Sequence, residues 1–291
     1  MSADAKSLDD LRREIDQIDD SLHDLLIRRA AVSLDIAKVK QPANGAALAS
    51  AMRPAREAAI LRRLLARHKG ELPPGVVVGI WRQIIAASLR AQAKYEIHVF
   101  GGNGQTAFLD LAHTYFGSAA PLRLHSRVSQ VVNACAEEPN SLGIVPMPEL
   151  EEPGAAWWSK LAVSGQVGPR VIAKLPFIVN GEEAVSAYAI GAIEQEASGD
   201  DTTLLVLEIA SGLSRTKLRS LLKEAGLDAN IVAAGRISEK NAPDEILAEV
   251  KGFIPKDDPR LKRLAEAAGD AVYRADPIGG FANPVVLAAR R

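Results

Sequence analysis

The chain has 291 residues, of which 47% are hydrophobic, and its formal net charge at pH 7 is −1. A chain of this length and apolar content can bury more than one core, so we expect two or three domains. The near-zero charge provides no general field that would favour nucleic acid or an anionic membrane, so any anion selectivity must be local. A single cysteine, Cys135, excludes an intrachain disulfide framework and suits a reducing compartment.

The N-terminal segment and the apolar runs predict a soluble protein. Residues 1–10 are acidic and contain no apolar run, so they resemble neither a secretory signal nor a transit peptide. No stretch reaches the roughly 18 apolar residues that a membrane span needs. The best candidate, residues 76–89, contains Trp81, Arg82 and Gln83. We therefore expect a cytoplasmic protein that associates with neither a membrane nor nucleic acid.

A heptad-like pattern predicts a long first helix. Over residues 8–39, apolar residues recur at alternating steps of three and four, and Arg29 occupies the interrupted position. A capping box of Ser7 and Asp10 opens the helix, which ends near Lys40. At about 1.5 Å per residue the helix spans about 50 Å, which is too long to be buried within one small domain. This length predicts packing against the helices of a second subunit.

Two further helices are expected after a loop over residues 41–51. They cover about residues 53–69 and 76–93, each has an apolar face, and glycine and proline residues separate them. Three helices without a strand make up the first predicted domain, residues 1–94.

Polar side chains interrupt the apolar faces of these helices. Arg29 and Lys40 are eleven residues apart, close to three helical turns, so they point to the same side. Each alone also fits a cation at the edge of a core with its charge in water. The other two helices contribute Arg56, Glu57, Ser88 and Gln92. If these groups converge, the pocket suits a small dianion with a hydroxyl and an ether oxygen, and it does not suit hydrolysis.

Several spaced motifs occur in order along this region: LRREIDQID at 11–19, Arg29, KVK at 38–40, RPARE at 53–57 and QIIAASLRAQ at 83–92. Together they resemble the all-helical chorismate mutases, including the domain that is fused to prephenate dehydratase in bifunctional enzymes. The resemblance covers about residues 8–92. It implies an all-α three-helix domain in an intertwined helical dimer that acts on chorismate and needs no cofactor.

The resemblance also implies roles for individual residues. Arg12 and Arg29 would bind the two carboxylates of chorismate, and Lys40 and Gln92 would donate hydrogen bonds to its ether oxygen. Glu57 would hold the ring hydroxyl. The reaction would be an intramolecular Claisen rearrangement to prephenate, in which the site holds the substrate in a chair and stabilises charge on the ether oxygen.

Three more residues of the same site follow from the matched motifs. Ser88 would assist at a carboxylate, and Arg56 would line the pocket. Arg53 stands where the best-known bifunctional relatives carry an aspartate three residues before the Arg-Glu pair. It is either a solvated residue at the helix start or a further substrate contact.

The spacing of two arginines predicts a shared site. Arg12 and Arg29 are seventeen residues apart on one helix, about 25 Å by the helical rise, which is too far for both to hold one small molecule. If the site is real, Arg12 must come from a partner chain. We therefore expect an antiparallel homodimer in which Arg12 is supplied in trans.

The composition changes to an α/β pattern at Tyr95. Strands are expected at about 97–100, 142–146 and 170–173, with a glycine-rich tight turn at 101–104. Residues 97–108 and 142–146 resemble parts of prephenate dehydratase domains, so residues 95–200 are interpreted as a truncated region of that kind. Residues 202–205 stand where a catalytic Thr-Arg-Phe would be sought, so we expect that dehydration has been lost.

The last predicted domain, residues 201–291, has a βαββαβ order of elements, which is typical of a ferredoxin-like module. It resembles a divergent ACT-type regulatory module, the kind that binds amino acids at dimer interfaces. The phenylalanine-sensing signatures Gly-Ala-Leu and Glu-Ser-Arg-Pro are absent, so either an effector or a structural role is possible. The expected protein is thus multidomain, with an all-α domain, an α/β region and this module in that order.

Five histidines, at positions 23, 68, 98, 113 and 125, show no spacing that suggests metal ligation, so no metal is predicted. Chorismate mutase is the leading hypothesis for the function. Three alternatives stay open: a bifunctional chorismate mutase/prephenate dehydratase, an isochorismate pyruvate lyase on the same scaffold, and a non-catalytic protein that binds chorismate or prephenate as a signal.

Overall fold

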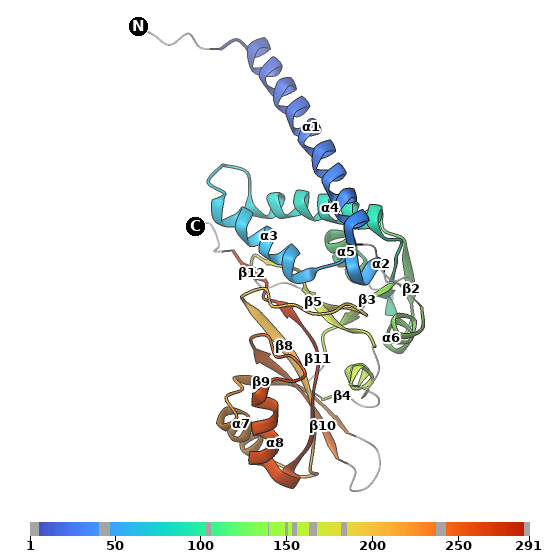
Figure 1. The fold of residues 1–291 in the computed structure, drawn as a ribbon, viewed down its shortest axis with the longest axis vertical. Helices are drawn as coiled ribbons and strands as arrows, with labels where there is room; N and C mark the ends of the chain where they lie inside the picture. Colours follow the sequence, from blue (N-terminus) through green and yellow to red (C-terminus); the bar gives the residue numbers. More distant parts are fainter. Residues whose placement is uncertain are drawn as a thin grey trace.

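The structure is a computed structural model that describes residues 6–40, 47–102, 106–138, 140–148, 151–152, 156–162, 168–181, 185–236 and 243–287. Helices form its first part, and a mixed sheet with helices packed on it forms the rest (Figure 1). The helices of the first part are α1 (Leu8–Lys40), α2 (Ala47–Ala51), α3 (Pro54–Arg67) and α4 (Pro74–Gln92). None of the described helices is long and apolar enough to cross a membrane.

The first helix begins and ends as the sequence predicted. The Ser7 hydroxyl accepts a hydrogen bond from the Asp10 amide at 3.1 Å, and the Ser7 amide donates to the Asp10 carboxylate at 3.1 Å. The loop predicted over residues 41–51 is wrong in its second half, because residues 47–51 form α2. Leu48 and Met52 lie four residues apart, and both are buried. Residues 41–46 lie outside the described part of the chain.

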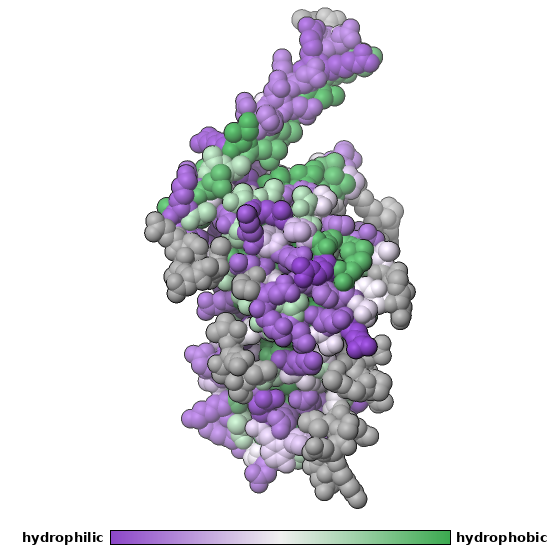
Figure 2. All heavy atoms as spheres, turned by 90° about the vertical axis from the view of Figure 1, so that its right-hand side faces the viewer, coloured by the Kyte–Doolittle hydropathy of each residue, from purple (hydrophilic) through white to green (hydrophobic). Residues whose placement is uncertain are grey.

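Helix α1 leaves the body of the protein and carries an uncovered apolar face. It contacts α4 near its C-terminal end, and its N-terminal half extends away from the other elements (Figure 1). None of its residues is buried, and the Leu25 side chain is 61% exposed. Apolar side chains follow the helix along its length (Figure 2). An exposed apolar surface of this kind marks an interaction site.

Ten of the described strands form one sheet, in the order β2-β1-β3-β7-β5-β11-β8-β10-β9-β4, and β12 pairs with β6. The strands are β1 (Glu96–Phe100), β2 (Leu122–His125), β3 (Ser141–Pro146), β4 (Glu151–Glu152), β5 (Arg170–Leu175), β6 (Ile178–Val179), β7 (Ala187–Gly191), β8 (Asp201–Ile209), β9 (Ala229–Arg236), β10 (Asp244–Lys251), β11 (Val272–Ala282) and β12 (Val285–Val286). The helices are α5 (Ala107–Phe116), α6 (Val128–Glu137), η3 (Trp157–Leu161), α7 (Arg215–Glu224), α8 (Pro259–Ala268) and η4 (Gly269–Ala271).

The strands predicted for residues 97–100, 142–146 and 170–173 are confirmed as β1, β3 and β5. Elements β2, α6 and β7, which the sequence did not indicate, complete this part of the sheet. Trp157 and Trp158 lie on the 3₁₀ helix η3, and both indoles are buried in a core. Cys135 is buried, and burial raises the pKa of its thiol to about 12.

The predicted βαββαβ order is present as β8, α7, β9, β10, α8 and β11, with α7 and α8 packed on these strands. The closing strand β11 extends to Ala282, and Ile278 and Phe281 within it are buried. The boundaries at 94/95 and 200/201 stay predictions, and strands from both sides of residue 200 share one sheet.

One glycine lies where the two halves of the sheet meet. Gly279 of β11 is the residue paired with Val171 of β5, and its φ of 124° lies in the region that favours glycine. A Cβ at this position would overlap the backbone of Val171. Close approach of the two strands therefore requires a residue without a side chain.

We expect Gly279→Ala to lower the free energy of unfolding by more than about 2 kcal/mol, because it adds both backbone strain and a steric overlap. Denaturant unfolding of the full chain measures this loss. The matched control is Gly168→Ala, since a Cβ at Gly168 has no atom within 4 Å. Equal stability of the two variants would contradict this account of the junction.

Candidate active site

A cavity of about 340 Å³ lies between α1, α3 and α4, next to α2. This volume falls in the range of small-molecule sites. Every predicted site residue except Arg12 lies on its wall. The lining residues are Arg29, Val32, Ser33, Ile36, Lys40, Ala51, Arg53, Arg56, Glu57, Ile60, Ile85, Ser88, Leu89 and Gln92.

Hydrogen bonds between α1 and α4 fix two of these side chains. Arg29 donates through Nη1 to the Ser88 hydroxyl at 2.8 Å, and Ser88 donates to the Ile84 carbonyl at 2.9 Å. Gln92 donates through Nε2 to the Ser33 hydroxyl at 2.8 Å. Burial lowers the pKa of the Arg29 guanidinium, and an arginine nevertheless stays charged at neutral pH. The charge of Arg29 and the amide of Gln92 therefore reach the cavity from prearranged positions.

Lys40 lies at the C-terminal end of α1 and is exposed. Its ammonium donates to the Ser50 carbonyl of α2 at 2.7 Å. An ammonium group has three donor hydrogens, so this bond leaves donors for a ligand in the cavity. Helix α2, which the sequence analysis missed, thus supplies the group that orients Lys40.

The two arginines before and within α3 differ in their partners. Arg53 makes a two-pronged contact with Glu196, with Nε–Oε2 at 3.0 Å and Nη2–Oε1 at 2.6 Å, and both side chains are about half exposed. Arg56 has no hydrogen bond or ion pair among the described residues, so its guanidinium is available to the cavity. The first arginine thus binds the segment before β8, and whether it also contacts substrate stays a prediction.

Glu57 is the one carboxylate on the cavity wall, and it is bound by Arg82, which does not line the cavity. Glu57 accepts a hydrogen bond from Arg82 Nη1 at 2.9 Å, and the exposed fractions of the two side chains are 11% and 3%. The Arg82 guanidinium lies 3.9 Å from the centre of the Tyr115 ring and 5.1 Å from that of Phe177. Tyr115 belongs to α5 and Phe177 follows β5, so the α/β region contributes to the position of Glu57.

The electrostatics of Glu57 are a balance of opposed effects. Burial raises the pKa of the Glu57 carboxyl, while the charge and the hydrogen bond of Arg82 oppose that rise. The carboxylate form thus depends on the arginine.

The sequence analysis treated Arg82 only as an interruption of an apolar stretch. A signal was available: Val78 and Ala86, four residues to either side, are both apolar and both buried. An arginine on the buried face of a helix needs an acidic partner, because an unpaired charge is too costly to bury.

Arg12 lies outside the cavity. It is on the N-terminal part of α1, its side chain is 67% exposed, and it contacts Asp9 at 3.4 Å. The part of α1 that carries Arg12 extends away from the rest of the chain (Figure 1). Within one chain, therefore, the structure brings together all of the predicted set except this arginine.

The helical part of the chain is similar to a known protein family. The chorismate mutase type II family matches residues 11–93. The bifunctional chorismate mutase/prephenate dehydratase of Pseudomonas aeruginosa is 29% identical over 151 residues, which cover 52% of this chain and 41% of that protein. The bifunctional chorismate mutase/prephenate dehydratase of Aquifex aeolicus is 30% identical over 151 residues, which cover 50% of this chain and 40% of that protein. The chain thus matches less than half the length of these relatives.

Among solved structures, the prephenate dehydratase from Streptococcus mutans is similar, with a TM-score of 0.46 and 14% identity; the match covers 67% of this chain and 99% of that one. The prephenate dehydratase from Arthrobacter aurescens, in complex with L-Phe, has a TM-score of 0.47 and 11% identity; the match covers 65% of this chain and 90% of that one. The family match lies on the helices that form the cavity. Residues 11–93 therefore match the chorismate mutase type II family, and an α/β region with a large mixed sheet follows them.

Proposed function

We propose that this chain is a chorismate mutase that converts chorismate to prephenate in the synthesis of phenylalanine and tyrosine. The observation that carries the proposal is the cavity between α1, α3 and α4, where cations and neutral donors surround one carboxylate. Such a lining complements a small dianion with one hydroxyl. The family match over the same helices supports the choice of substrate.

The proposed mechanism uses binding and electrostatics alone. Arg29, assisted by Ser88, would bind one substrate carboxylate, and Arg56 lines the cavity beside it. Lys40 and Gln92 would donate to the ether oxygen, where negative charge grows as the C–O bond breaks. Donors already held in place need no reorganisation in the transition state, which favours the compact substrate conformer.

The carboxylate of Glu57 would accept a hydrogen bond from the ring hydroxyl of the substrate. Arg82 keeps Glu57 in place without facing the cavity itself. Arg53 would remain at the rim, where Glu196 holds it. In this scheme no residue forms a covalent bond with the substrate.

The second part of the proposal is an antiparallel homodimer. Helix α1 has an apolar face that its own chain leaves uncovered, and the helices of a second copy are the complementary partner. In that arrangement Arg12 of one subunit would complete the cavity of the other and bind the second substrate carboxylate.

For the α/β region we propose residues 95–200 as a dehydratase-like remnant and 201–291 as a ferredoxin-like, ACT-like module. The order β11-β8-β10-β9, with α7 and α8 on these strands, supports the second assignment. Thr202 of β8 donates its hydroxyl to Oδ1 of Asn283, which follows β11, at 2.7 Å. We do not propose dehydration for this chain, and phenylpyruvate formed from prephenate would overturn that view. A cytoplasmic location fits its free, buried cysteine.

The first test is a chorismate-loss assay with identification of the product. We expect Lys40→Ala and Gln92→Ala each to lower kcat by at least about 100-fold, because each removes a donor to the ether oxygen. Lys38→Ala is the matched control, since Lys38 is exposed and pairs with Asp35 outside the cavity. Equal rates in all variants would exclude these donors. Pyruvate released from isochorismate would favour the lyase, and tight binding without turnover would favour a sensor.

The second test concerns the origin of Arg12. We expect Arg12→Ala and Arg29→Ala to be inactive separately and to recover activity when the two chains are co-expressed, because a mixed dimer contains one unaltered site. Arg13→Ala, whose arginine pairs with Asp10, is the control and should stay active. Sedimentation measures the assembly. An active monomer, or no recovery in a demonstrated mixed dimer, would contradict a site shared between subunits.

The third test removes the partner of Glu57. The Arg82→Met variant lacks the charge and the hydrogen bond that lower the pKa of Glu57, so the effect of burial raises this pKa. The acidic limb of the pH–rate profile should therefore move to higher pH. We also expect stability at neutral pH to fall by about 3–5 kcal/mol, since the buried carboxylate has lost its counter-ion. Because protonation removes that charge, the loss should shrink as the pH falls through the raised pKa.

The double variant Glu57→Gln/Arg82→Met should recover part of this stability, measured by denaturant unfolding at several pH values. Arg90→Met, on the same helix, is the control, since Arg90 has no carboxylate partner among the described residues and lies near the Tyr95 ring. A pH-independent loss in Arg82→Met would argue against the proposed coupling.

A further inference from the structure

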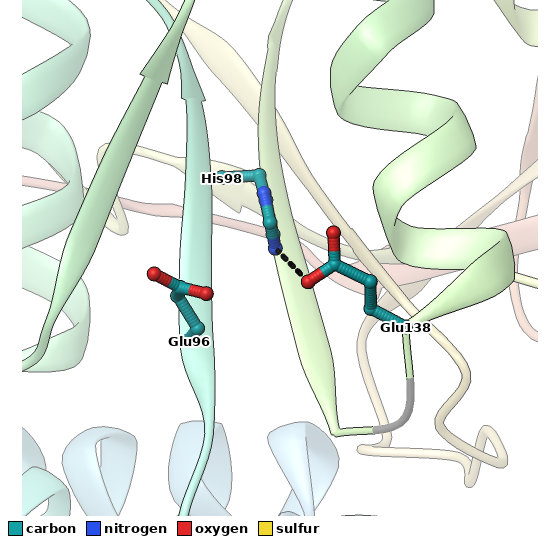
Figure 3. Close-up of side chains that lie close together, drawn as sticks. All are labelled: Glu96, His98 and Glu138. Atoms are coloured by element: carbon teal, nitrogen blue, oxygen red, sulfur yellow. Dashed lines mark ion pairs between the residues drawn. The ribbon is translucent and has the colours of Figure 1, made fainter.

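A second cluster of ionisable side chains lies in the α/β region, away from the mutase cavity. Glu96 and His98 are two residues apart on β1, and Glu138 follows directly after α6 (Figure 3). One ligand atom from each of the three residues lies within 4.8 Å of the others. The cluster therefore has one imidazole and two carboxylates around a common point.

The central histidine has an unsatisfied nitrogen aimed into the cluster. The His98 side chain is fully buried, and its Nε2 has no hydrogen-bond partner. The closest carboxylate oxygen is Oε2 of Glu138 at 3.7 Å, which is too long for a hydrogen bond (Figure 3). Buried polar atoms are nearly always paired, so this nitrogen requires an explanation.

The other ring nitrogen of His98 indicates which explanation fits. Nδ1 lies 2.8 Å from Nε2 of His125 on β2, so one of the two rings donates to the other. If His98 donates from Nδ1, its Nε2 presents a lone pair to the carboxylates. Histidines that bind metals commonly donate their other N–H to a neighbouring acceptor in this way. Burial lowers the pKa of His98, which favours the neutral ring at neutral pH.

Arg123 on β2 is a cation that would compete with a metal ion for the carboxylates of Glu96 and Glu138. Its guanidinium lies 2.9 Å from Oε2 of Glu96 and 3.6 Å from Oε1 of Glu138. The closest contact of Arg123 with Glu138 is to Oε1, whereas Oε2 is the oxygen that faces His98. A metal ion can therefore bind the inner oxygens while Arg123 keeps its place on the outer ones.

We propose that Glu96, His98 and Glu138 form a binding site for a divalent transition-metal ion such as Zn²⁺. One imidazole with two carboxylates suits zinc better than magnesium or calcium, which prefer oxygen alone. Both glutamates are partly exposed, so the ion has a path from solvent and at least one position for water. The ion would join β1 to the C-terminal end of α6. The histidine spacing in the sequence did not reveal this set.

The test uses the full chain, free of any affinity tag and stripped of metal, titrated with Zn²⁺ in a calorimeter. We expect about one ion per chain, and at least about tenfold weaker binding in Glu138→Gln and in His98→Asn. Co²⁺ should show a visible absorption band in the wild type that both variants lose. His113→Gln is the control, because His113 lies on α5 outside the cluster.

Glu138→Gln replaces a partly exposed side chain with one of similar size, so it keeps the test valid if His98→Asn fails to fold. Chorismate turnover should be unchanged in Glu138→Gln, which separates this proposal from the mutase assignment. Wild-type binding no tighter than that of Glu138→Gln, or an equal loss in His113→Gln, would overturn the metal site.

Discussion

The buried ion pair between Glu57 and Arg82 connects the cavity to the rest of the fold. Burying two charges costs desolvation that only close contact and further partners offset. Here those partners are the ring of Tyr115 on α5 and the ring of Phe177 after β5. The carboxylate on the cavity wall is thus positioned through an arginine that elements of the α/β region hold. The helices that form the cavity are packed against the α/β region at this point.

Helix α1 imposes a different constraint, because it forms one wall of the cavity while its apolar face is uncovered. The wall and the uncovered face share one side of the helix, since the exposed Val32 and Ile36 line the cavity together with Arg29. A helix in this situation is held in place partly by its own chain, through the bonds of Arg29 to Ser88 and of Gln92 to Ser33. Preorganisation of the cavity and association of the helix are therefore coupled.

The sequence predicted what depends on local periodicity and failed where distant segments meet. The three long helices follow from apolar spacing and end signals, and the motif match placed seven residues that do line one cavity. Arg82 was missed because its partners, Tyr115 and Phe177, lie far along the chain. Element β7 was missed because five small or apolar residues carry no alternation. His98 and His125 are 27 positions apart and meet only because β1 and β2 pair.

The junction of β11 with β5 also bears on how this protein is made. Residues 171 and 279 are more than one hundred positions apart, so β5 cannot pair with β11 until that much further chain has been made. The helices of residues 8–92 leave the ribosome before the strands of the sheet. Strand β5 then has one open edge until β11 is synthesised, since its other neighbour is β7. A nascent chain therefore exposes an unpaired strand edge while roughly one hundred further residues are translated.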